Sequence, residues 1–583
     1  MKYETLLRVL DGICQEAPVE FKSYHPKPSD TEKVCQARAK AFIHLYLKVK
    51  FGISTFKERH DLVCDGSYDG GLDAYYIDTE KKRLYLIQSK FRMTEKNFEE
   101  KSITADDLVR MDIKRILDGE DTDSNGKKFH SKIKTFQNKW ASIRDQAKYE
   151  YVVLFLGNLR KYSDAQVKRL IENSKYEVFD YERTYKELLF ALCSGTYYNP
   201  QEVEIKINLA DKTKPILEQT VITKYGEYDI AMLYVPVSEI GRVVAKYQNA
   251  ILEYNPRNFL ELSKNTVNQK IYKSAIACTG NEFALLNNGI TMISHSFEST
   301  KRTGVKGVGQ IILDRPQIIN GGQTAHTLSR VYESEQPKSL EGKEVLLKVV
   351  VVSDHNLLAN RQFIEEISNA TNEQTKVSEA DRRSNHPVQV KLQQKLFQKY
   401  GLFYERKRGE FHTGHAEGYI NRENVIERVS LAKAFLALKG NPTEARRYGA
   451  DTLFTEDRFK KTFGEGKNYS TMLFAYLVLR HLRKLSRTRR FGMWERHSLR
   501  YGKMAIIAAV GKKGFSKKST LSEMEAEVSK KLKKLEPKWR RFEAWMKKRR
   551  VNKDYVEDGA FNFDNYYKGK TINEDVRKYF AKR

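Results

Sequence analysis

The stretch DGGLDAYYIDTEKKRLYLIQSKF, residues 69–91, sets two apolar, Tyr- and Leu-rich runs on either side of TEKK, whose composition indicates a turn. A hairpin closed over this turn pairs Asp78 with Arg83 and Asp73 with Gln88. Directly opposed residues share one face of a hairpin, and strand alternation adds Lys90 to that face. The hairpin is therefore predicted to gather an acid, an amide and an amine at its open end.

Such a cluster suits metal-dependent hydrolysis of a phosphodiester. Mg²⁺ (or Mn²⁺) prefers oxygen ligands, lowers the pKa of a bound water and neutralises charge on the phosphate. We expect Asp73 to ligate the metal and Gln88 to ligate it or orient a water. Lys90 would serve the nucleophile and stabilise the anionic transition state. The spacing alone also fits an ordinary hairpin with an exposed Lys.

These residues resemble the PD-(D/E)xK nuclease superfamily in its Mrr-like branch, with Gly70, Gly71, Asp73, Gln88 and Lys90 at the matching positions. The resemblance implies a restriction-endonuclease-like α/β domain and a divalent metal. Gln88 stands where Asp or Glu is more usual, which removes one negative charge from the metal site.

Two further features of this segment bear on the metal site. These nucleases often take another acid from the preceding helix, and Glu32 is the only Glu of the predicted helix 31–50. The sequence DGSYDG, residues 65–70, begins like an EF-hand loop. A calcium loop is rejected because Tyr76 stands where that loop requires Glu and strand-like runs replace the flanking helices.

The chain is long enough for several domains. Residues 1–195 alternate helices and strands, with Asp30, Ser163 and Gly195 as predicted helix caps and 149–158 as a buried strand, which indicates one α/β domain. A mixed α/β region, 200–430, and a basic, mainly helical region, 431–583, follow. The five Cys are scattered and no apolar run is long enough to span a membrane. We therefore expect a cytoplasmic protein with no membrane partner.

Positive charge dominates the composition, with a formal net charge of +29. The stretch from Arg480 to Lys553 holds 25 Lys and Arg residues against 6 Asp and Glu residues. Such a region attracts polyanions and releases their counterions, and we expect nucleic acid as the partner. The candidate phosphate contacts here are Arg489, Arg490, Lys547 and Arg549. Interleaved aromatics such as Trp494, Trp539 and Phe542 would stack on bases or form the core of the same helices.

The middle region carries amide-rich motifs. In RPQIINGGQTAHTL, the turn Asn320, Gly321, Gly322 is predicted to lead from a strand into a helix that starts near Gln323 or Thr324, a geometry that suits an anion. It equally suits a tight connection capped by Thr324. Further amides and arginines, able to bond phosphates and bases or to cap turns, are Asn288, Asn372, Arg406 and Arg408.

Together NNGIT, INGGQT, ISNATNEQTKVSEADRRSN and FYERKRG resemble the abortive infection phage resistance (AIPR) family over about residues 225–430. The resemblance implies antiphage defence with the N-terminal domain as effector. The NGGQT element also resembles a ParB-like turn that binds nucleotide phosphates, although Asn320 replaces the acid and the Arg is missing.

The sequence thus predicts an antiphage endonuclease that hydrolyses nucleic acid, with DNA as the expected substrate. Cutting both strands of a duplex would call for a homodimer. Two alternatives stay open: a binding protein in which Gln88 marks a decayed metal site, and a nucleotide-driven switch at Asn320–Thr324.

Overall fold

The structure is a computed structural model of the chain. It describes all residues except 67, 80, 105–111, 161, 172–173, 198–202, 210, 212, 256–265, 278–279, 301–306, 335–336, 353–356, 372–377, 465–467, 489–491, 493, 512–519, 551–554, 558–559 and 581–583. The chain forms two compact units. Unit 1 comprises Met1–Leu252, Leu260–Asp354 and Phe411–Ile420, and unit 2 comprises Glu253–Phe259, His355–Glu410 and Asn421–Arg583. Among the described helices, none is both long and apolar enough to cross a membrane.

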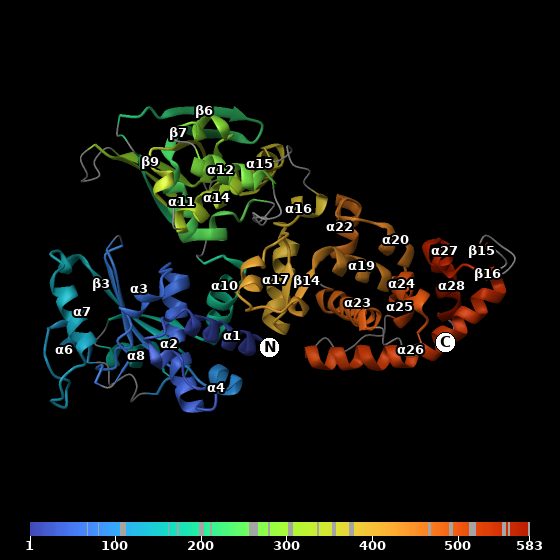
Figure 1. The fold of residues 1–583 in the computed structure, drawn as a ribbon, viewed down its shortest axis with the longest axis horizontal. Helices are drawn as coiled ribbons and strands as arrows, with labels where there is room; N and C mark the ends of the chain where they lie inside the picture. Colours follow the sequence, from blue (N-terminus) through green and yellow to red (C-terminus); the bar gives the residue numbers. More distant parts are fainter. Residues whose placement is uncertain are drawn as a thin grey trace. The chain divides into compact units, whose positions relative to one another are not determined.

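The N-terminal part of unit 1 is built on a four-stranded sheet in the order β1-β2-β3-β4. Its strands are β1 (Ala74–Asp78), β2 (Arg83–Ser89), β3 (Glu150–Leu156) and β4 (Lys175–Phe179). The first two are antiparallel, β3 is parallel to β2, and β4 is parallel to β3. The helices drawn around it in Figure 1 are α1 (Lys2–Gln15), α2 (Thr31–Lys50), α3 (Phe56–His60), α4 (Glu95–Glu100), α6 (Ile113–Leu117), α7 (Ser131–Ala141) and α8 (Asp164–Leu170).

The hairpin has the predicted register. Asp78 pairs with Arg83 and Ala74 pairs with Ile87, and the ladder ends there, one residue short of the predicted pair of Asp73 and Gln88. Aromatic rings pack on both faces of this sheet. Tyr75 of β1 packs on Phe136 of α7, with ring centroids 4.3 Å apart, and Tyr76 packs on Phe51, with ring centroids 4.0 Å apart. The sequence prediction of a hairpin closed by residues 79–82 is therefore confirmed.

The predicted boundaries in this region are also found. The Asp30 side chain accepts a hydrogen bond from the Lys33 N–H at the start of α2. Ser163 forms a capping box at the start of α8, and Gly195, with φ 67°, ends α10 (Phe190–Ser194). The helix before α10 departs from expectation, since Thr184–Leu189 is a π-helix that widens the turn.

Two further sheets form the rest of unit 1. One has the strand order β5-β10-β9 and the other the order β11-β8-β12-β7-β6. Their strands are β5 (Glu204–Leu209), β6 (Leu217–Thr223), β7 (Gly226–Pro236), β8 (Ile290–Ser294), β9 (Ser296–Thr300), β10 (Gly309–Asp314), β11 (Gln317–Asn320) and β12 (Glu344–Val351). The helices α11 (Val237–Tyr247), α12 (Thr266–Ala277) and α14 (Gly322–Glu333) bury a common apolar core with these sheets.

Unit 2 is mainly helical, as the sequence predicts for its C-terminal part (Figure 1). Its larger helices are α15 (Leu357–Thr371), α17 (Pro387–Tyr400), α19 (Arg428–Leu438), α22 (Glu456–Phe463), α23 (Tyr469–Thr488), α24 (Arg496–Tyr501), α25 (Lys503–Val510), α26 (Leu521–Arg550), α27 (Phe563–Lys568) and α28 (Thr571–Phe580). Short strand pairs join β13 (Phe403–Glu405) to β14 (Val425–Glu427) and β15 (Val556–Glu557) to β16 (Ala560–Phe561).

Helix α26 has one packed face and one charged face. The packed face repeats every three or four residues and consists of Leu521, Met524, Val528, Leu532, Leu535, Trp539, Phe542 and Met546. Trp494, 6% exposed, also lies in this core, against Trp539. These aromatic side chains are therefore core residues and are not available to stack on bases.

Candidate functional site: an acidic cluster at the open end of the hairpin

Asp73 directly precedes β1, and both its backbone and its carboxylate are hydrogen-bonded to β2. Its backbone N–H donates at 3.0 Å to the carbonyl oxygen of Ile87, the residue that pairs with Ala74 in the ladder. Its carboxylate accepts a hydrogen bond from the backbone N–H of Ser89 at 2.6 Å. The position of this carboxylate is thus fixed by the register of the hairpin.

Asp65 reaches Asp73 through a short extension of the sheet. The backbone N–H groups of Cys64 and Asp65 both donate to the carbonyl oxygen of Asp73, at 2.8 and 3.0 Å, and the N–H of Tyr75 donates to Leu62. Lys132 of α7 donates to the carbonyl oxygen of Val63 at 2.8 Å and supports the same segment. This pairing lays Asp65 beside the start of β1.

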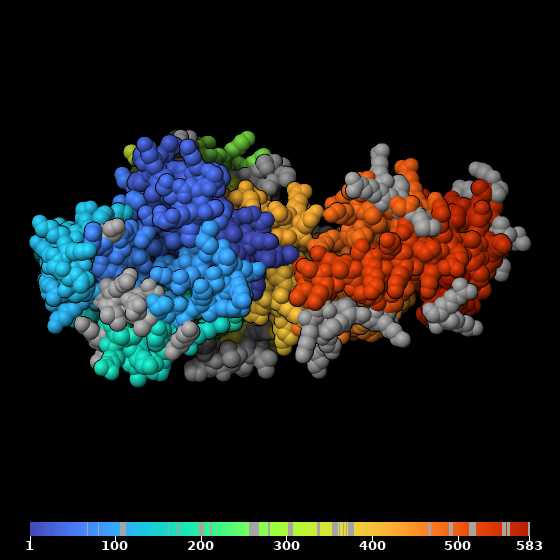
Figure 2. All heavy atoms as spheres, turned by 90° about the horizontal axis from the view of Figure 1, so that it is seen from below, coloured from blue at the N-terminus to red at the C-terminus, as the bar shows by residue number. Residues whose placement is uncertain are grey.

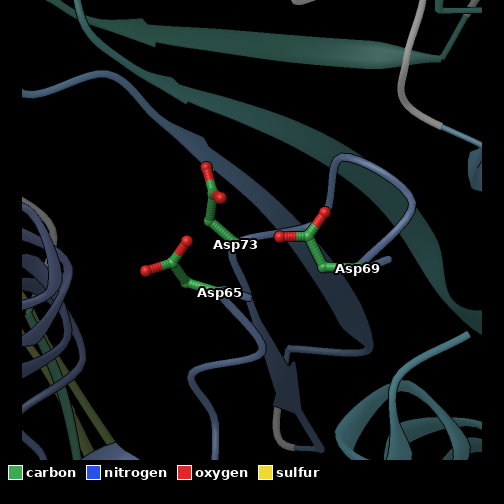
Figure 3. Close-up of side chains that lie close together, drawn as sticks. All are labelled: Asp65, Asp69 and Asp73. Atoms are coloured by element: carbon green, nitrogen blue, oxygen red, sulfur yellow. The ribbon is translucent and has the colours of Figure 1, made fainter. Parts of the chain in front are cut away.

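Asp69 closes the loop between them. Its two carboxylate oxygens accept hydrogen bonds from the backbone N–H groups of Gly66, at 3.1 Å, and Gly71, at 2.9 Å. One carboxylate oxygen from each of Asp65, Asp69 and Asp73 lies within 4.8 Å of the others, and Figure 3 shows the three side chains around the end of the strand. Three acids from nine consecutive residues therefore converge.

The cluster carries concentrated negative charge. Burial raises the pKa of Asp73 well above its usual range, and the charges of Asp65 and Asp69 add to this effect. The Ser89 N–H and the charge of Lys90 oppose it. Burial and the charge of Asp65 likewise raise the pKa of Asp69. A divalent cation would relieve this repulsion, and an all-oxygen donor set is the set that Mg²⁺ prefers.

Gln88 and Lys90 lie at the end of β2, where it pairs with β3. Gln88 is 7% exposed and pairs with Phe155, and the backbone N–H of Lys90 donates to the carbonyl oxygen of Leu156 at 2.8 Å. Lys90 also lines a small cavity together with Arg92 and Lys101. Of these cations, Lys90 adjoins the acidic cluster, because its charge opposes the rise in the pKa of Asp73.

The acidic cluster contains one predicted metal ligand, Asp73, and two acids that were not predicted. Asp73 is a member of the cluster, whereas Glu32 is exposed in the first turn of α2 and is not. Asp65 and Asp69 were missed as partners of Asp73, although the sequence signal was present: both belong to the DGSYDG segment that begins like a calcium loop.

The NGGQT turn, residues 320–324, lies against the NNG turn, residues 287–289. A Cβ atom at Gly321, with φ 81°, would lie 2.7 Å from the carbonyl oxygen of Gly289, because β11 pairs with β8 at this end. The Asn320 side chain accepts a hydrogen bond from the Gly321 N–H at 2.7 Å, and the Thr324 hydroxyl donates to the Asn287 amide oxygen at 3.4 Å.

The other predicted phosphate-binding residues have different surroundings. Asn288 and Arg408 are exposed. The Arg406 side chain, 11% exposed, pairs with Glu410 and donates to Gln393, so its guanidinium serves the fold. Lys547 and Arg549 are exposed on the last turn of α26. The remaining three, Asn372, Arg489 and Arg490, lie outside the described residues.

These features define a large two-unit protein with an acidic, metal-suited cluster in an α/β region and a basic helical region. The family model described as "AIPR protein" matches residues 252–553, which is more than half of the chain. The chain therefore belongs to the AIPR protein family, and this membership suggests a role in abortive-infection defence against phage. Neither a curated protein nor a solved structure matches the chain.

Proposed function

We propose that the protein is a metal-dependent nuclease of antiphage defence whose chemistry takes place at the acidic cluster. The convergence of Asp65, Asp69 and Asp73 at the open end of the hairpin carries this proposal. The matched family segment starts at residue 252, so the proposal for the N-terminal region depends on its own geometry and on the resemblance of its hairpin to PD-(D/E)xK nucleases.

Each residue at the cluster has a distinct role in phosphodiester hydrolysis. A bound Mg²⁺ or Mn²⁺ lowers the pKa of its water and neutralises charge that develops on the phosphate. Asp73 and Asp65 would supply carboxylate oxygens to hold it, and Asp69 fixes the loop through Gly66 and Gly71. Gln88 orients the water or adds its amide oxygen. Lys90 donates to the attacking water and stabilises the anionic transition state.

The sheet topology supports this assignment. An antiparallel hairpin carries the polar residues, and its second strand continues into two parallel strands. Helices between β2 and β3 and between β3 and β4 make the crossovers that parallel strands require. This arrangement accords with the restriction-endonuclease-like domain that the resemblance implies, with nucleic acid, DNA in the first place, as substrate.

The decisive experiment is a cleavage assay on supercoiled plasmid, linear duplex, single-stranded DNA and RNA with Mg²⁺ or Mn²⁺. Wild type is compared with Asp73→Asn and Lys90→Ala. Lys81→Ala, at the closed end of the same hairpin, is the matched control. We expect each cluster variant to cut at least about a hundredfold more slowly, since a group that stabilises transition-state charge contributes this much. The control should cut at the wild-type rate.

A substrate cut equally well by wild type and by both cluster variants would place the chemistry elsewhere. No cutting by the wild type, together with metal-independent nucleic-acid binding, would instead favour a binding protein with a decayed site. Isothermal titration of Mg²⁺ into wild type and Asp73→Asn separates a decayed site from an intact site that lacks an activator.

A second candidate function is nucleotide binding where the NNG and NGGQT turns meet. The contact between Gly289 and Gly321 gathers the amides of Asn287, Asn288 and Asn320 near the start of α14, where backbone N–H groups favour anions. Binding of ATP or GTP that is lost in Asn320→Ala and in Gln323→Ala would support this function. Binding unchanged by both substitutions would reject it.

A further inference from the structure

Unit 2 contains a strongly basic groove. It has a volume of about 650 Å³ and lies between α23 and α26, which contact each other. Its lining includes five Arg and Lys residues against two Glu residues. The cationic residues are Arg422, Arg480, Arg483, Lys484 and Arg487.

Helical spacing puts four of these cations on one stripe of α23. Arg480, Arg483, Lys484 and Arg487 are separated by three, one and three residues, which places them on one helix face. From first to last the stripe covers about 10 Å of helix. This length spans about two or three consecutive phosphates of a nucleic-acid strand.

The cations of the stripe differ in their attachments. Arg480 pairs with Glu525 of α26 and donates to the carbonyl oxygen of Glu423, while Arg483 donates to the Ser430 hydroxyl at 2.9 Å. Lys484 and Arg487 are exposed, and within the described part of the chain neither forms an ion pair. Arg480 and Arg483 are thus held in place by the fold. Lys484 and Arg487 line the groove and, among the described residues, have no ion-pair partner.

Burial and the excess of positive charge both lower the pKa values of neighbouring titratable groups. Burial lowers the pKa of His481, and the charges of Lys484 and Arg480 lower it further. Burial also lowers the pKa of Lys433 and of Lys503, and in both cases the charge of Arg483 contributes. A bound anion would remove this repulsion, so the groove is suited to a ligand of negative charge.

We propose that the groove between α23 and α26 binds the phosphodiester backbone of a nucleic-acid strand, with Lys484 and Arg487 contacting phosphates and Arg480 and Arg483 shaping the wall. Helix α26 also carries an exposed charged face outside the groove, with Lys530, Lys533, Lys534, Lys538 and Arg541. Figure 2 shows this helix at the surface of unit 2, in orange to red. The site is separate from the acidic cluster and does not depend on a metal.

The test uses the full-length protein, fluorescein-labelled single-stranded DNA, RNA and duplex DNA, and EDTA to prevent cleavage. Fluorescence anisotropy is measured over a series of salt concentrations for Lys484→Gln/Arg487→Gln. The matched control, Lys533→Gln/Lys534→Gln, removes the same charge from the exposed face of α26, outside the groove. Lys484→Arg/Arg487→Lys is included to retain the charge in the groove.

We expect the groove variant to bind about tenfold more weakly and to lower the slope of log K against log salt by about two, since two phosphate contacts are lost. The control should lose less than about twofold, and the charge-retaining variant should bind like wild type. Equal losses in the groove variant and the control would overturn the proposal, because net charge alone would then explain binding.

Competition experiments with other anions identify which class of ligand binds in the groove. Inorganic triphosphate and poly-glutamate are added to the wild-type complex at matched charge concentration. Displacement of the oligonucleotide only by unlabelled nucleic acid supports the proposal. Displacement by triphosphate at much lower concentration would indicate a small-anion site, and equal displacement by poly-glutamate would indicate an acidic protein partner; either result overturns it.

Discussion

At the residue scale, Asp73 combines a fixed position with unfavourable electrostatics. Its carboxyl group has a raised pKa, chiefly because of burial, so the folded protein holds this proton more tightly than the unfolded chain does. The associated stability is present below the ordinary pKa of Asp and is lost as the pH rises through the native pKa. Without metal, ionisation of Asp73 therefore costs folding free energy.

We predict that Asp73→Asn raises the stability of the metal-free protein by about 1 kcal/mol at about pH 8 and has little effect at about pH 4. Asn retains an oxygen to accept the Ser89 N–H and carries no charge. The same variant should lose the stabilisation that Mg²⁺ gives the wild type through binding to the native state. Thermal melting at both pH values, with and without MgCl₂, measures these effects. A destabilised variant that still responds to Mg²⁺ would contradict the prediction.

Sequence reasoning reached Asp73 but not its acidic neighbours. The pairing of Asp73 with the end of β2 followed from strand alternation, which is a local rule. Asp65 joins the cluster because Cys64 and Asp65 bond the Asp73 carbonyl oxygen, a loop conformation that depends on the bonds of Asp69 and on Lys132 from α7. No repeating pattern of residues in the sequence predicts such a loop conformation.

At the element scale, the two amide-rich turns are built on close backbone contact. Gly321→Ala would combine a left-handed conformation with a Cβ atom 2.7 Å from the Gly289 carbonyl oxygen. At Gly342, with φ 73°, an added Cβ meets no atom within 4 Å. Both glycines adopt a left-handed conformation, and they differ only in the space that is available for an added Cβ atom.

We predict that Gly321→Ala lowers the free energy of unfolding of this region by at least about 2 kcal/mol, whereas Gly342→Ala costs about 1 kcal/mol. Pulse proteolysis in urea measures both. Equal losses would show that the contact between the NNG and NGGQT turns adds nothing to the conformational strain.

Helix α26 is anchored to its neighbours by one buried carboxylate. A single oxygen of Glu543 accepts hydrogen bonds from the Ser498 hydroxyl at 2.5 Å, from the Trp539 indole at 3.1 Å and from the Tyr567 hydroxyl. Burial alone would raise the pKa of Glu543, but the contact with His497 and the hydrogen bonds from Ser498 and Tyr567 hold it below its usual range. This carboxylate joins α24, α26 and α27.

We predict that Glu543→Gln destabilises unit 2 by about 2–3 kcal/mol at neutral pH, because the donors lose a charged acceptor. Since the native pKa is lowered, the wild-type contribution is present above the ordinary pKa of Glu and disappears as the pH falls through the native value. Urea unfolding followed by Trp fluorescence reports it, as Trp539 lies at the site. Glu527→Gln removes a partly exposed ion pair with Lys531 on the same helix and should change stability by less than about 0.5 kcal/mol.

At the scale of the whole molecule, the alternation of helices and strands in residues 1–195 and the helical C-terminal region could be predicted, but the path of the chain between units could not. Phe411–Ile420 returns to unit 1 after residues 355–410 have joined unit 2. Tight packing explains this return: an added Cβ at Gly414 would lie 2.9 Å from the Cys193 carbonyl oxygen, and Phe411 packs on Phe190. Such long-range contacts leave no local signature in the sequence.

The acidic cluster and the basic groove share no residue, so metal binding and nucleic-acid binding should respond to different substitutions in the full chain. With a net charge of +29, the protein should lose about a thousandfold in nucleic-acid affinity between about 50 and about 200 mM salt. Asp73→Asn should leave the affinity and the salt slope within about twofold of wild type in EDTA, since it removes a negative charge and touches no phosphate-binding cation. Lys484→Gln/Arg487→Gln should in turn keep the wild-type thermal shift with Mg²⁺. A tenfold or greater loss of affinity in Asp73→Asn would mean that the acidic cluster itself positions the nucleic acid, and that binding and cleavage depend on one site.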